Sequence, residues 1–151
     1  MTSGLHRLSG ACVLIVDDDA GAADLYALWL RDVGHRPSIV SDAKRALILA
    51  PILRPAVVVA AIGLPGMDGI ELVRRLRELS ELAHCRYVAI TADADASLPG
   101  RCRAAGFAEF FEKPLQKAAL LKSFGVLRSA ADLHHARGSA WLVSRGLRRN
   151  D

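Results

Sequence analysis

Apolar residues gather into five short runs along the chain, and each run is followed by a longer segment with helical spacing. The clearest run is residues 57–62, Val-Val-Val-Ala-Ala-Ile, which has no polar interruption. An unbroken apolar run of this length is typical of a strand buried on both faces of a sheet. It ends in a turn cluster that contains Gly63, Pro65 and Gly66. The other predicted strands are residues 12–16, 37–40, 87–90 and 107–111.

The segments between these runs carry the apolar spacing of amphipathic helices. In the first, Tyr26, Trp29, Leu30 and Val33 lie at i, i+3, i+4 and i+7, which predicts one buried stripe. Asp68 precedes the third helix as a predicted N-cap. Strands that alternate with helices indicate an α/β fold, a doubly wound five-stranded parallel sheet with helices on both faces. The predicted helices are residues 20–33, 43–50, 69–79, 97–105 and 115–127.

At 151 residues the chain is long enough for one domain with a substantial core. We expect a flexible leader at 1–11, the folded domain at 12–127 and a basic extension at 128–151. Hydrophobic residues make up 52% of the chain, but no window approaches a membrane span. The N-terminal residues show no signal-peptide pattern, so we expect a cytoplasmic protein without a membrane partner. The three cysteines are widely spaced and odd in number, which argues against a disulfide framework or a zinc site.

The formal net charge of +4 permits an acidic partner without requiring one. Much of this charge comes from the extension at 128–151, where five arginines stand against two aspartates. The extension is too short for a separate DNA-binding fold, so we expect it to pack on its own domain or on a partner protein. A DNA-binding regulator that acts through this tail remains an alternative hypothesis.

Polar side chains stand at the carboxyl ends of three of the predicted strands, where ligands bind in doubly wound sheets. Asp17 and Asp18 follow the first strand, Thr91 ends the fourth and Lys113 follows the fifth. Paired carboxylates suit Mg²⁺, which prefers oxygen ligands. A hydroxyl and an ammonium nearby suit a phosphoryl group. The third strand brings only Ala61 to this edge, and a methyl group has no chemistry to offer.

Four segments of the sequence resemble the receiver domains of two-component response regulators, and the resemblance runs from Val13 to Leu127. It rests on residues 13–18 (VLIVDD), 62–69 (IGLPGMDG), 89–92 (AITA), and Gly106-Phe107 with Lys113-Pro114. The resemblance implies a flavodoxin-like receiver fold with strand order 2-1-3-4-5. It also implies a role in phosphorelay signalling, with a sensor histidine kinase or another signalling protein as partner.

The resemblance also implies roles for individual residues. Asp17 and Asp18 would hold Mg²⁺ together with the backbone carbonyl of Gly63. Thr91 and Lys113 would contact the phosphoryl group. Phe110 would be the aromatic side chain that moves when Thr91 moves.

Ala61 departs from the family pattern, because the phosphoacceptor of receiver domains is an aspartate at this position. A methyl group cannot form an acyl phosphate or ligate a metal. We therefore expect no phosphorylation at the usual site and weak or absent Mg²⁺ binding. Either the chain is a natural degenerate receiver, or the aspartate was replaced to trap an unphosphorylated form; the sequence leaves both open.

The leading hypothesis is a receiver module that acts by protein–protein contacts and is not an enzyme. An enzyme on the same doubly wound architecture, such as a phosphatase or a flavin protein, is the alternative that fold alone leaves open. The fifth predicted helix has apolar residues on more than one face, with Leu120, Phe124 and Leu127 on one stripe and Ala118 and Leu121 on another. This pattern predicts a homodimer or partner interface on that helix.

Overall fold

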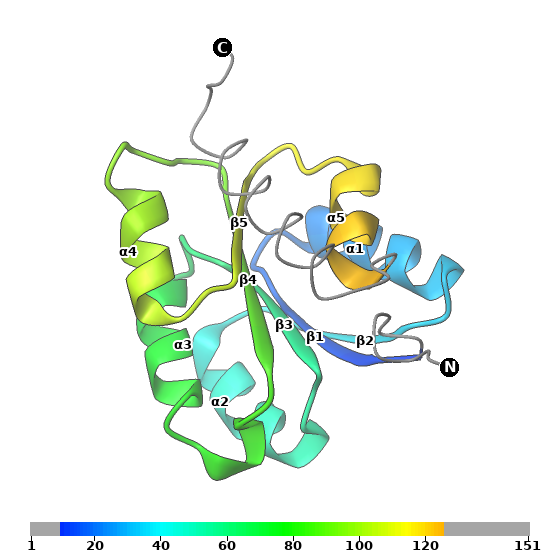
Figure 1. Cartoon of the computed structure of the whole chain (residues 1–151), viewed down its shortest axis with the longest axis horizontal. Coiled ribbons are helices and arrows are strands. Elements are labelled where there is room, and N and C mark those ends of the chain that lie inside the picture. Colours follow the sequence, from blue (N-terminus) through cyan, green and yellow to red (C-terminus); the bar gives the residue numbers. More distant parts are fainter. Residues whose placement is uncertain (1–9, 126–151) are drawn as a thin grey trace.

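The computed structural model describes residues 10–125, and within them the chain forms one parallel sheet of five strands (Figure 1). The strand order is β2-β1-β3-β4-β5, so the predicted doubly wound fold and its strand order are confirmed. β3 lies at the centre and is buried along its whole length, as its unbroken apolar run predicts. The strands are β1 (Cys12–Val16), β2 (Arg36–Val40), β3 (Val57–Ala61), β4 (Arg86–Thr91) and β5 (Glu109–Glu112).

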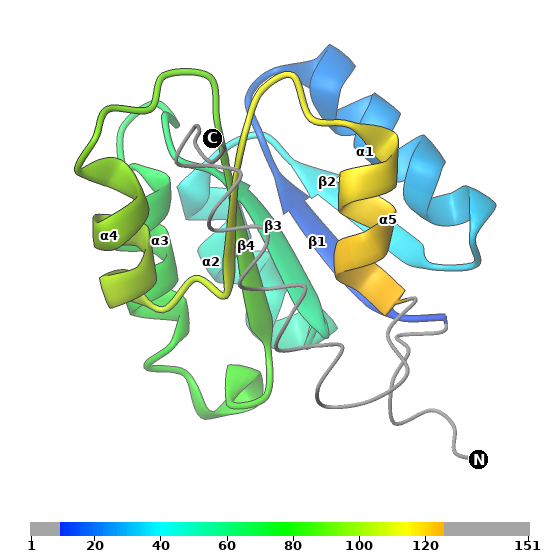
Figure 2. The same ribbon diagram turned by 45° about the horizontal axis from the view of Figure 1, so that its top comes forward.

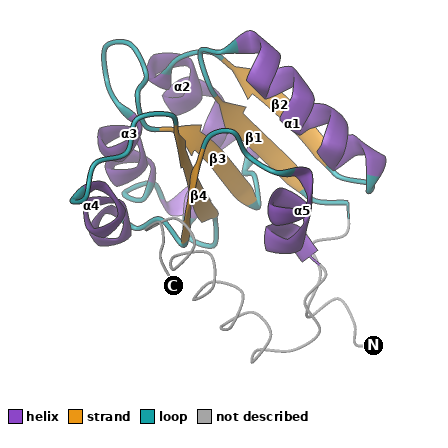
Figure 3. Cartoon of the chain, turned by 90° about the horizontal axis from the view of Figure 1, so that it is seen from above, coloured by secondary structure: helices purple, strands orange, loops and turns teal. Residues whose placement is uncertain are grey.

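Helices cover both faces of this sheet. α1 and α5 lie on one face, and α2, α3 and α4 lie on the other (Figures 2 and 3). The α-helices are α1 (Ala20–Asp32), α2 (Ala43–Leu53), α3 (Gly69–Leu76), α4 (Leu98–Ala105) and α5 (Lys117–Gly125), with a short 3₁₀ helix η2 (Ser80–Leu82) before β4. Three of these helices are preceded by an N-cap aspartate whose carboxylate accepts a backbone N–H from the first turn. The capping residues are Asp19, Asp42 and Asp68. The predicted cap of α3, Asp68, is therefore confirmed.

The core has two layers, one on each side of the sheet. Because side chains alternate along a strand, Val57 and Val59 enter the layer under α1 and α5, whereas Val58 and Ala60 enter the layer under α2, α3 and α4. Every strand therefore contributes to both layers or stands at an edge. β2 is the edge strand beside β1, and Pro37 on it has no backbone N–H to donate.

The predicted stripe of α1 is partly wrong. Tyr26 and Leu30 are buried, but Trp29 is only half-buried and Val33, at the end of the helix, is 49% exposed. The rest of the buried face is made by Ala23 and Ala27. Small side chains let α1 approach the sheet closely, and a pattern search that favours large apolar residues misses them.

Element boundaries differ from prediction by a few residues. β5 begins at Glu109 rather than at residue 107, because Gly106 takes a left-handed φ of 116° at the end of α4 and the chain needs two residues to re-enter the sheet. α3 ends at Leu76 rather than at residue 79. The described residues leave out nearly all of the predicted leader at 1–11 and all of the predicted basic extension at 128–151. The predicted end of the fifth helix, at Leu127, also lies outside them. Among residues 10–125, every helix is too short or too polar to span a lipid bilayer.

Candidate functional site

The carboxyl ends of β1 and β3 bring Asp17 and Ala61 to the same level of the sheet. Val16 pairs with Ala60, so Asp17 follows β1 where Ala61 ends β3. Ala61 in turn pairs with Ile90, which places Thr91 one residue beyond it on β4. The sequence-based expectation that these strand ends converge is therefore met by the register of the sheet.

Lys113 lies in the loop after β5 and contacts this group of strand-end residues. Its backbone N–H donates to Thr91 O at 2.7 Å, which continues the pairing of β4 with β5 and fixes the loop. Its Nζ lies 3.0 Å from Asp17 Oδ2 and 4.0 Å from Asp19 Oδ2. The ammonium is mostly shielded from water, and the Asp17 side chain is 3% exposed. The most buried carboxylate at the site thus has a cation as its direct partner.

Both carboxylate oxygens of Asp17 are engaged within the protein. Oδ2 faces Lys113, and Oδ1 accepts the backbone N–H of Asp19 at 2.9 Å. Asp19 itself caps α1 by accepting the Ala22 N–H at 3.1 Å. Asp18 is exposed at the surface between them. The aspartate triplet therefore has one buried ion-pair member, one solvent-facing carboxylate and one helix cap.

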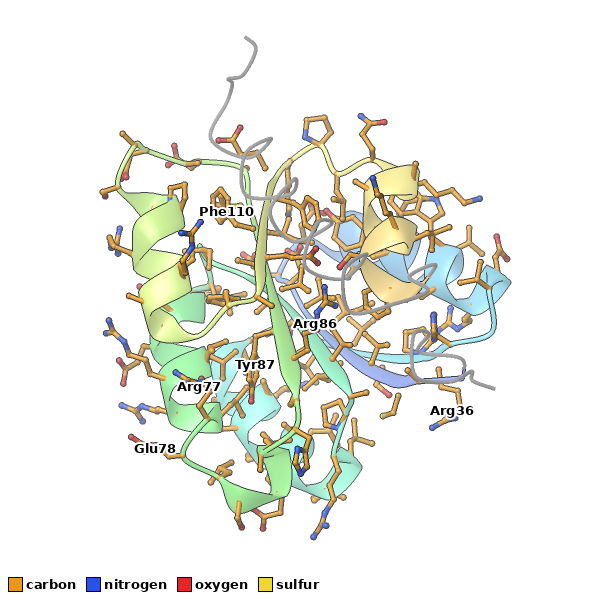
Figure 4. All side chains as sticks on the ribbon, in the orientation of Figure 1. Arg36, Arg77, Glu78, Arg86, Tyr87 and Phe110 are labelled. Carbon is orange, nitrogen blue, oxygen red and sulfur yellow. The ribbon has the colours of Figure 1, made fainter. Side chains whose placement is uncertain are left out.

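Thr91 and Phe110 lie in the neighbouring strands. Thr91 is buried, and its Oγ1 accepts the backbone N–H of Asp93 at 3.2 Å. Phe110 is fully buried in the core layer on the side of α4, opposite Ala89 on β4 (Figure 4). Gly63 follows β3 in an exposed loop.

The donor atoms of Asp17, Asp18 and the Gly63 carbonyl are of the kind that Mg²⁺ prefers. The fit is partial, however, because β3 brings no carboxylate to the site and Lys113 already neutralises Asp17. Within residues 10–125, acidic, histidine and cysteine side chains form no group of three that is arranged to hold a metal ion.

Tyr26 and Gly69 also lie at the site, although no role at the site was predicted for either residue. Burial, aided by the negative charges of Asp17 and Asp19, raises the pKa of the Tyr26 phenol to about 12. Gly69 begins α3 against the end of β3, where an added Cβ would lie 2.3 Å from Ala61 O. In the sequence, Gly69 lies in the segment 62–69 that carries the family resemblance and directly after the capping Asp68, but neither signal indicates its close contact with Ala61. Tyr26 shows only as part of an apolar stripe, which does not reveal its neighbouring carboxylates.

Known proteins with a similar sequence or fold agree on one kind of domain. Residues 13–124 match the family described as response regulator receiver domain. An uncharacterised 14.6 kDa protein of Leptolyngbya boryana is 33% identical over 118 residues, which are 78% of this chain and 90% of that protein. The DNA-binding response regulator MtrA of Mycolicibacterium paratuberculosis is 38% identical over 60 residues, 40% of this chain but only 27% of MtrA.

Solved structures give the same result. The chemotaxis response regulator CheY4 of Vibrio cholerae superposes with a TM-score of 0.70 at 26% identity, over 76% of this chain and 95% of CheY4. A putative response regulator of Chloroflexus aurantiacus superposes with the same TM-score at 27% identity, over 75% of this chain and 93% of its own.

Proposed function

The chain belongs to the response regulator receiver domain family, and on that premise we propose that it is a receiver module that cannot be phosphorylated at the usual position. Receiver domains are generally non-enzymatic signalling domains that bind Mg²⁺ and interact with sensor histidine kinases and other signalling proteins. We propose that Ala61 occupies the phosphoacceptor position in this chain. We propose that the chain acts by protein–protein contacts and not through its own acyl phosphate.

The observation that carries this proposal is the position of Ala61. Ala61 is the last residue of β3, level with Asp17 after β1 and with Ile90, the residue before Thr91, on β4. We propose that this is the position of the family's aspartate. A phosphoryl group shifts a two-state protein only if it interacts differently with the two states. Without an acceptor at Ala61 there is no covalent phosphoryl group for Thr91 and Lys113 to contact, so the resting state persists. Phe110, buried on the α4 side, is then held in its present position.

The ion pair between Lys113 and Asp17 supports the same proposal. With no carboxylate on β3, the Lys113 ammonium has Asp17 as its direct anionic partner and Asp19 at 4.0 Å. We therefore propose that Mg²⁺ binds weakly or not at all, because it would compete with Lys113 for Asp17 and would find one carboxylate fewer. Asp18 and the Gly63 carbonyl would be its remaining ligands.

The location and the partners follow from this role. The three cysteines, Cys12, Cys85 and Cys102, are free thiols, which fits the reducing cytoplasm where we propose that the protein acts. A sensor histidine kinase or another signalling protein is the proposed partner, and nucleic acid is not.

The interface predicted on α5 has less support, because Leu120 and Phe124 are buried against the sheet and Leu121 is half-buried. The predicted homodimer through α5 remains a proposal.

The test restores the missing carboxylate. The Ala61→Asp variant and the parent chain are incubated with Mg²⁺ and a small-molecule phosphodonor, and intact masses are compared. We expect the variant to gain the mass of one acid-stable, base-labile phosphoryl group and the parent to gain none. Equal labelling of the parent would overturn the proposal, and Ala61→Asn serves as a matched control that adds the side-chain volume without the nucleophile.

A further inference from the structure

The helices on the two faces of the sheet differ in charge. α2, α3 and α4, taken with their C-cap residues, carry eight cationic side chains and a single acidic one, Glu71. α1 and α5 on the opposite face are nearly balanced, with Arg31, Lys117 and Lys122 against two aspartates. The eight cations are Lys44, Arg45, Arg54, Arg74, Arg75, Arg77, Arg101 and Arg103. A face with this excess of positive charge attracts an acidic partner.

Two isoleucines on α2 lie among these cations and point away from the sheet. Ile48 is 64% exposed and Ile52 is 73% exposed, the two highest values among the exposed large hydrophobic residues of the part of the chain that the structure describes. Each lies two positions from a buried alanine, Ala46 or Ala50, and two positions are about 200° around a helix. Single exposed apolar residues are ordinary, but a pair at i and i+4 forms an apolar stripe.

α3 extends this outward surface. Arg74 lies two positions from Leu72 and two from Leu76, both buried, so it also points away from the sheet. α2 and α3 pack against each other on the same face of the sheet (Figure 3). Their outward side chains therefore belong to one continuous surface. We call it the basic face, and its residues are Lys44, Arg45, Ile48, Ile52, Arg54, Arg74 and Arg75.

The positive charge of the basic face is only partly neutralised within the protein. Arg45 lies 3.7 Å from the Asp42 carboxylate, and Arg75 lies 2.9 Å from that of Glu71. The other cations of the face form no ion pair with any of residues 10–125, and they are Lys44, Arg54 and Arg74. These three are available to carboxylates of another molecule.

Arg54 stands where the backbone favours a different residue. It is the C-cap of α2 with a left-handed φ of 51°, and within residues 10–125 it is the only residue other than glycine with a positive φ. Glycine is preferred in this conformation because it has no Cβ. The backbone therefore gives no reason for an arginine, whereas the exposed guanidinium adds a cation two residues after Ile52.

We propose that the basic face binds an acidic amphipathic segment of a partner protein. Apolar side chains of the segment cover Ile48 and Ile52, and its carboxylates lie opposite Lys44, Arg54 and Arg74. An apolar centre with a charged surround is the common anatomy of protein interfaces, and complementary charges give such interfaces specificity. This inference rests on the proposed action through protein–protein contacts and names the surface and the chemistry of one partner.

The pattern of charges favours a protein over a lipid surface or a nucleic acid. Asp42 and Glu71 lie beside the basic face and offset two of its cations, which weakens attraction to an anionic membrane because that attraction follows the number of unopposed cations. A protein can instead place single carboxylates opposite the unpaired cations. A nucleic acid would leave Ile48 and Ile52 uncovered, and α2 and α3 have no aromatic side chain on which a base could stack.

Fluorescence anisotropy with a labelled synthetic peptide tests the proposal on the full chain. The peptide is about 18 residues long, long enough for a helix, with leucines at i and i+4 and glutamates around them. We expect saturable binding that weakens as salt is added. Ile48→Gln and Lys44→Glu should each weaken it by about fivefold or more. Absence of binding, or unchanged affinity in both variants, would overturn the proposal.

Lys117→Glu is the matched control, because it makes the same charge change at an exposed position on α5, on the opposite face. It should change the affinity by less than about twofold, as expected for a charge outside the interface. A loss equal to that of Lys44→Glu would show that the peptide responds only to net charge, and the basic face would then not be a docking surface. Far-ultraviolet circular dichroism checks that each variant is folded.

Arg54→Gly separates binding from folding. We expect weaker peptide binding together with a urea midpoint that is unchanged or higher, since glycine suits the left-handed conformation. Vesicles of phosphatidylglycerol and phosphatidylcholine, and a random DNA duplex, are the competing probes. If either binds more tightly than the peptide and loses affinity in Lys44→Glu, the proposed partner is wrong. The phosphodonor experiment on Ala61→Asp involves none of these residues, so either proposal can fail while the other stands.

Discussion

Lys113 Nζ lies 3.0 Å from Asp17 Oδ2, and this ion pair joins the loop after β5 to the carboxyl end of β1. Asp17 follows β1 and Lys113 follows β5, and these two strands are separated by β3 and β4 in the sheet. The pair therefore links the ends of two strands that are not neighbours, and it gives Asp17 a cation as partner at an edge where β3 brings no carboxylate.

Removal of this cation should destabilise the fold. Lys113→Met leaves the buried Asp17 carboxylate without its ammonium partner, and we expect the free energy of unfolding to fall by about 2 kcal/mol. A double-mutant cycle with Asp17→Asn should give a coupling energy of about 1 to 3 kcal/mol. Lys117→Met, at an exposed position on α5, is the control and should change stability by less than about 0.5 kcal/mol. Urea unfolding measures all four variants, and a coupling near zero would contradict the pairing.

Magnesium binding should be weak in the parent chain and stronger once a carboxylate stands on β3. We expect a titration followed by Trp29 fluorescence to saturate only in the millimolar range, because Asp17 is already paired with Lys113. Ala61→Asp should lower the dissociation constant at least tenfold, since it adds a carboxylate. Asp18→Asn in the Ala61→Asp background should reverse that gain. Saturation of the parent at low micromolar Mg²⁺ would show that the site is complete without the third carboxylate.

The close contact between Gly69 and the end of β3 predicts a large difference between two glycine substitutions. Gly69→Ala would place its Cβ 2.3 Å from Ala61 O and 2.9 Å from Ile62 Cα, both backbone atoms that cannot move without shifting β3. We expect a loss of about 1 to 3 kcal/mol in the free energy of unfolding. Gly63→Ala, in the same loop with nothing within 4 Å of its Cβ, should be close to neutral. Equal effects of the two substitutions in thermal and urea unfolding would refute the steric explanation.

His35 predicts a pH dependence on the acid side of neutrality. Burial lowers the pKa of its imidazole, whose Nδ1 accepts the Ala11 N–H at 3.1 Å in the neutral form. Because the folded pKa lies below the unfolded value of about 6.5, the unfolded state binds the proton first, and stability is lost as pH falls below about 6.5. His35→Asn keeps an acceptor but cannot be protonated in this range. We expect urea unfolding at about pH 7.5 and about pH 5.5 to differ less in this variant than in the parent; an unchanged difference would assign the effect to other groups.

The backbone arrangement could be predicted from the sequence largely because hydrophobic periodicity is a local property. The run at 57–62 predicts a central strand, and Asp68 predicts the start of α3, because burial of a strand and capping of a helix each depend on a few neighbouring residues. The strand order came from resemblance to a family. Val33 was misplaced because its exposure depends on where α1 ends relative to the sheet, which is a tertiary property.

The site, too, could be predicted only in part from the sequence. The sequence brought Asp17, Thr91 and Lys113 to one edge of the sheet, but it did not indicate that Lys113 would pair with Asp17. Side-chain partners are chosen by rotamers and by competition among charges, which no spacing rule encodes. The buried cluster of Arg86, Glu109 and Ser123, which joins β4, β5 and α5, was also missed. Arg86 and Glu109 stand on neighbouring strands that are distant in sequence, so only the register of β4 with β5 reveals the pair.

Pro37 limits how far this protein can assemble. A sheet edge with free N–H groups can recruit strand after strand, and growth of that kind leads to fibres. On β2 the proline removes one of the outward donors, so recruitment of a further strand would leave its carbonyl unmatched. A single imino acid thus hinders the open edge of the sheet from serving as a template for open-ended polymerisation.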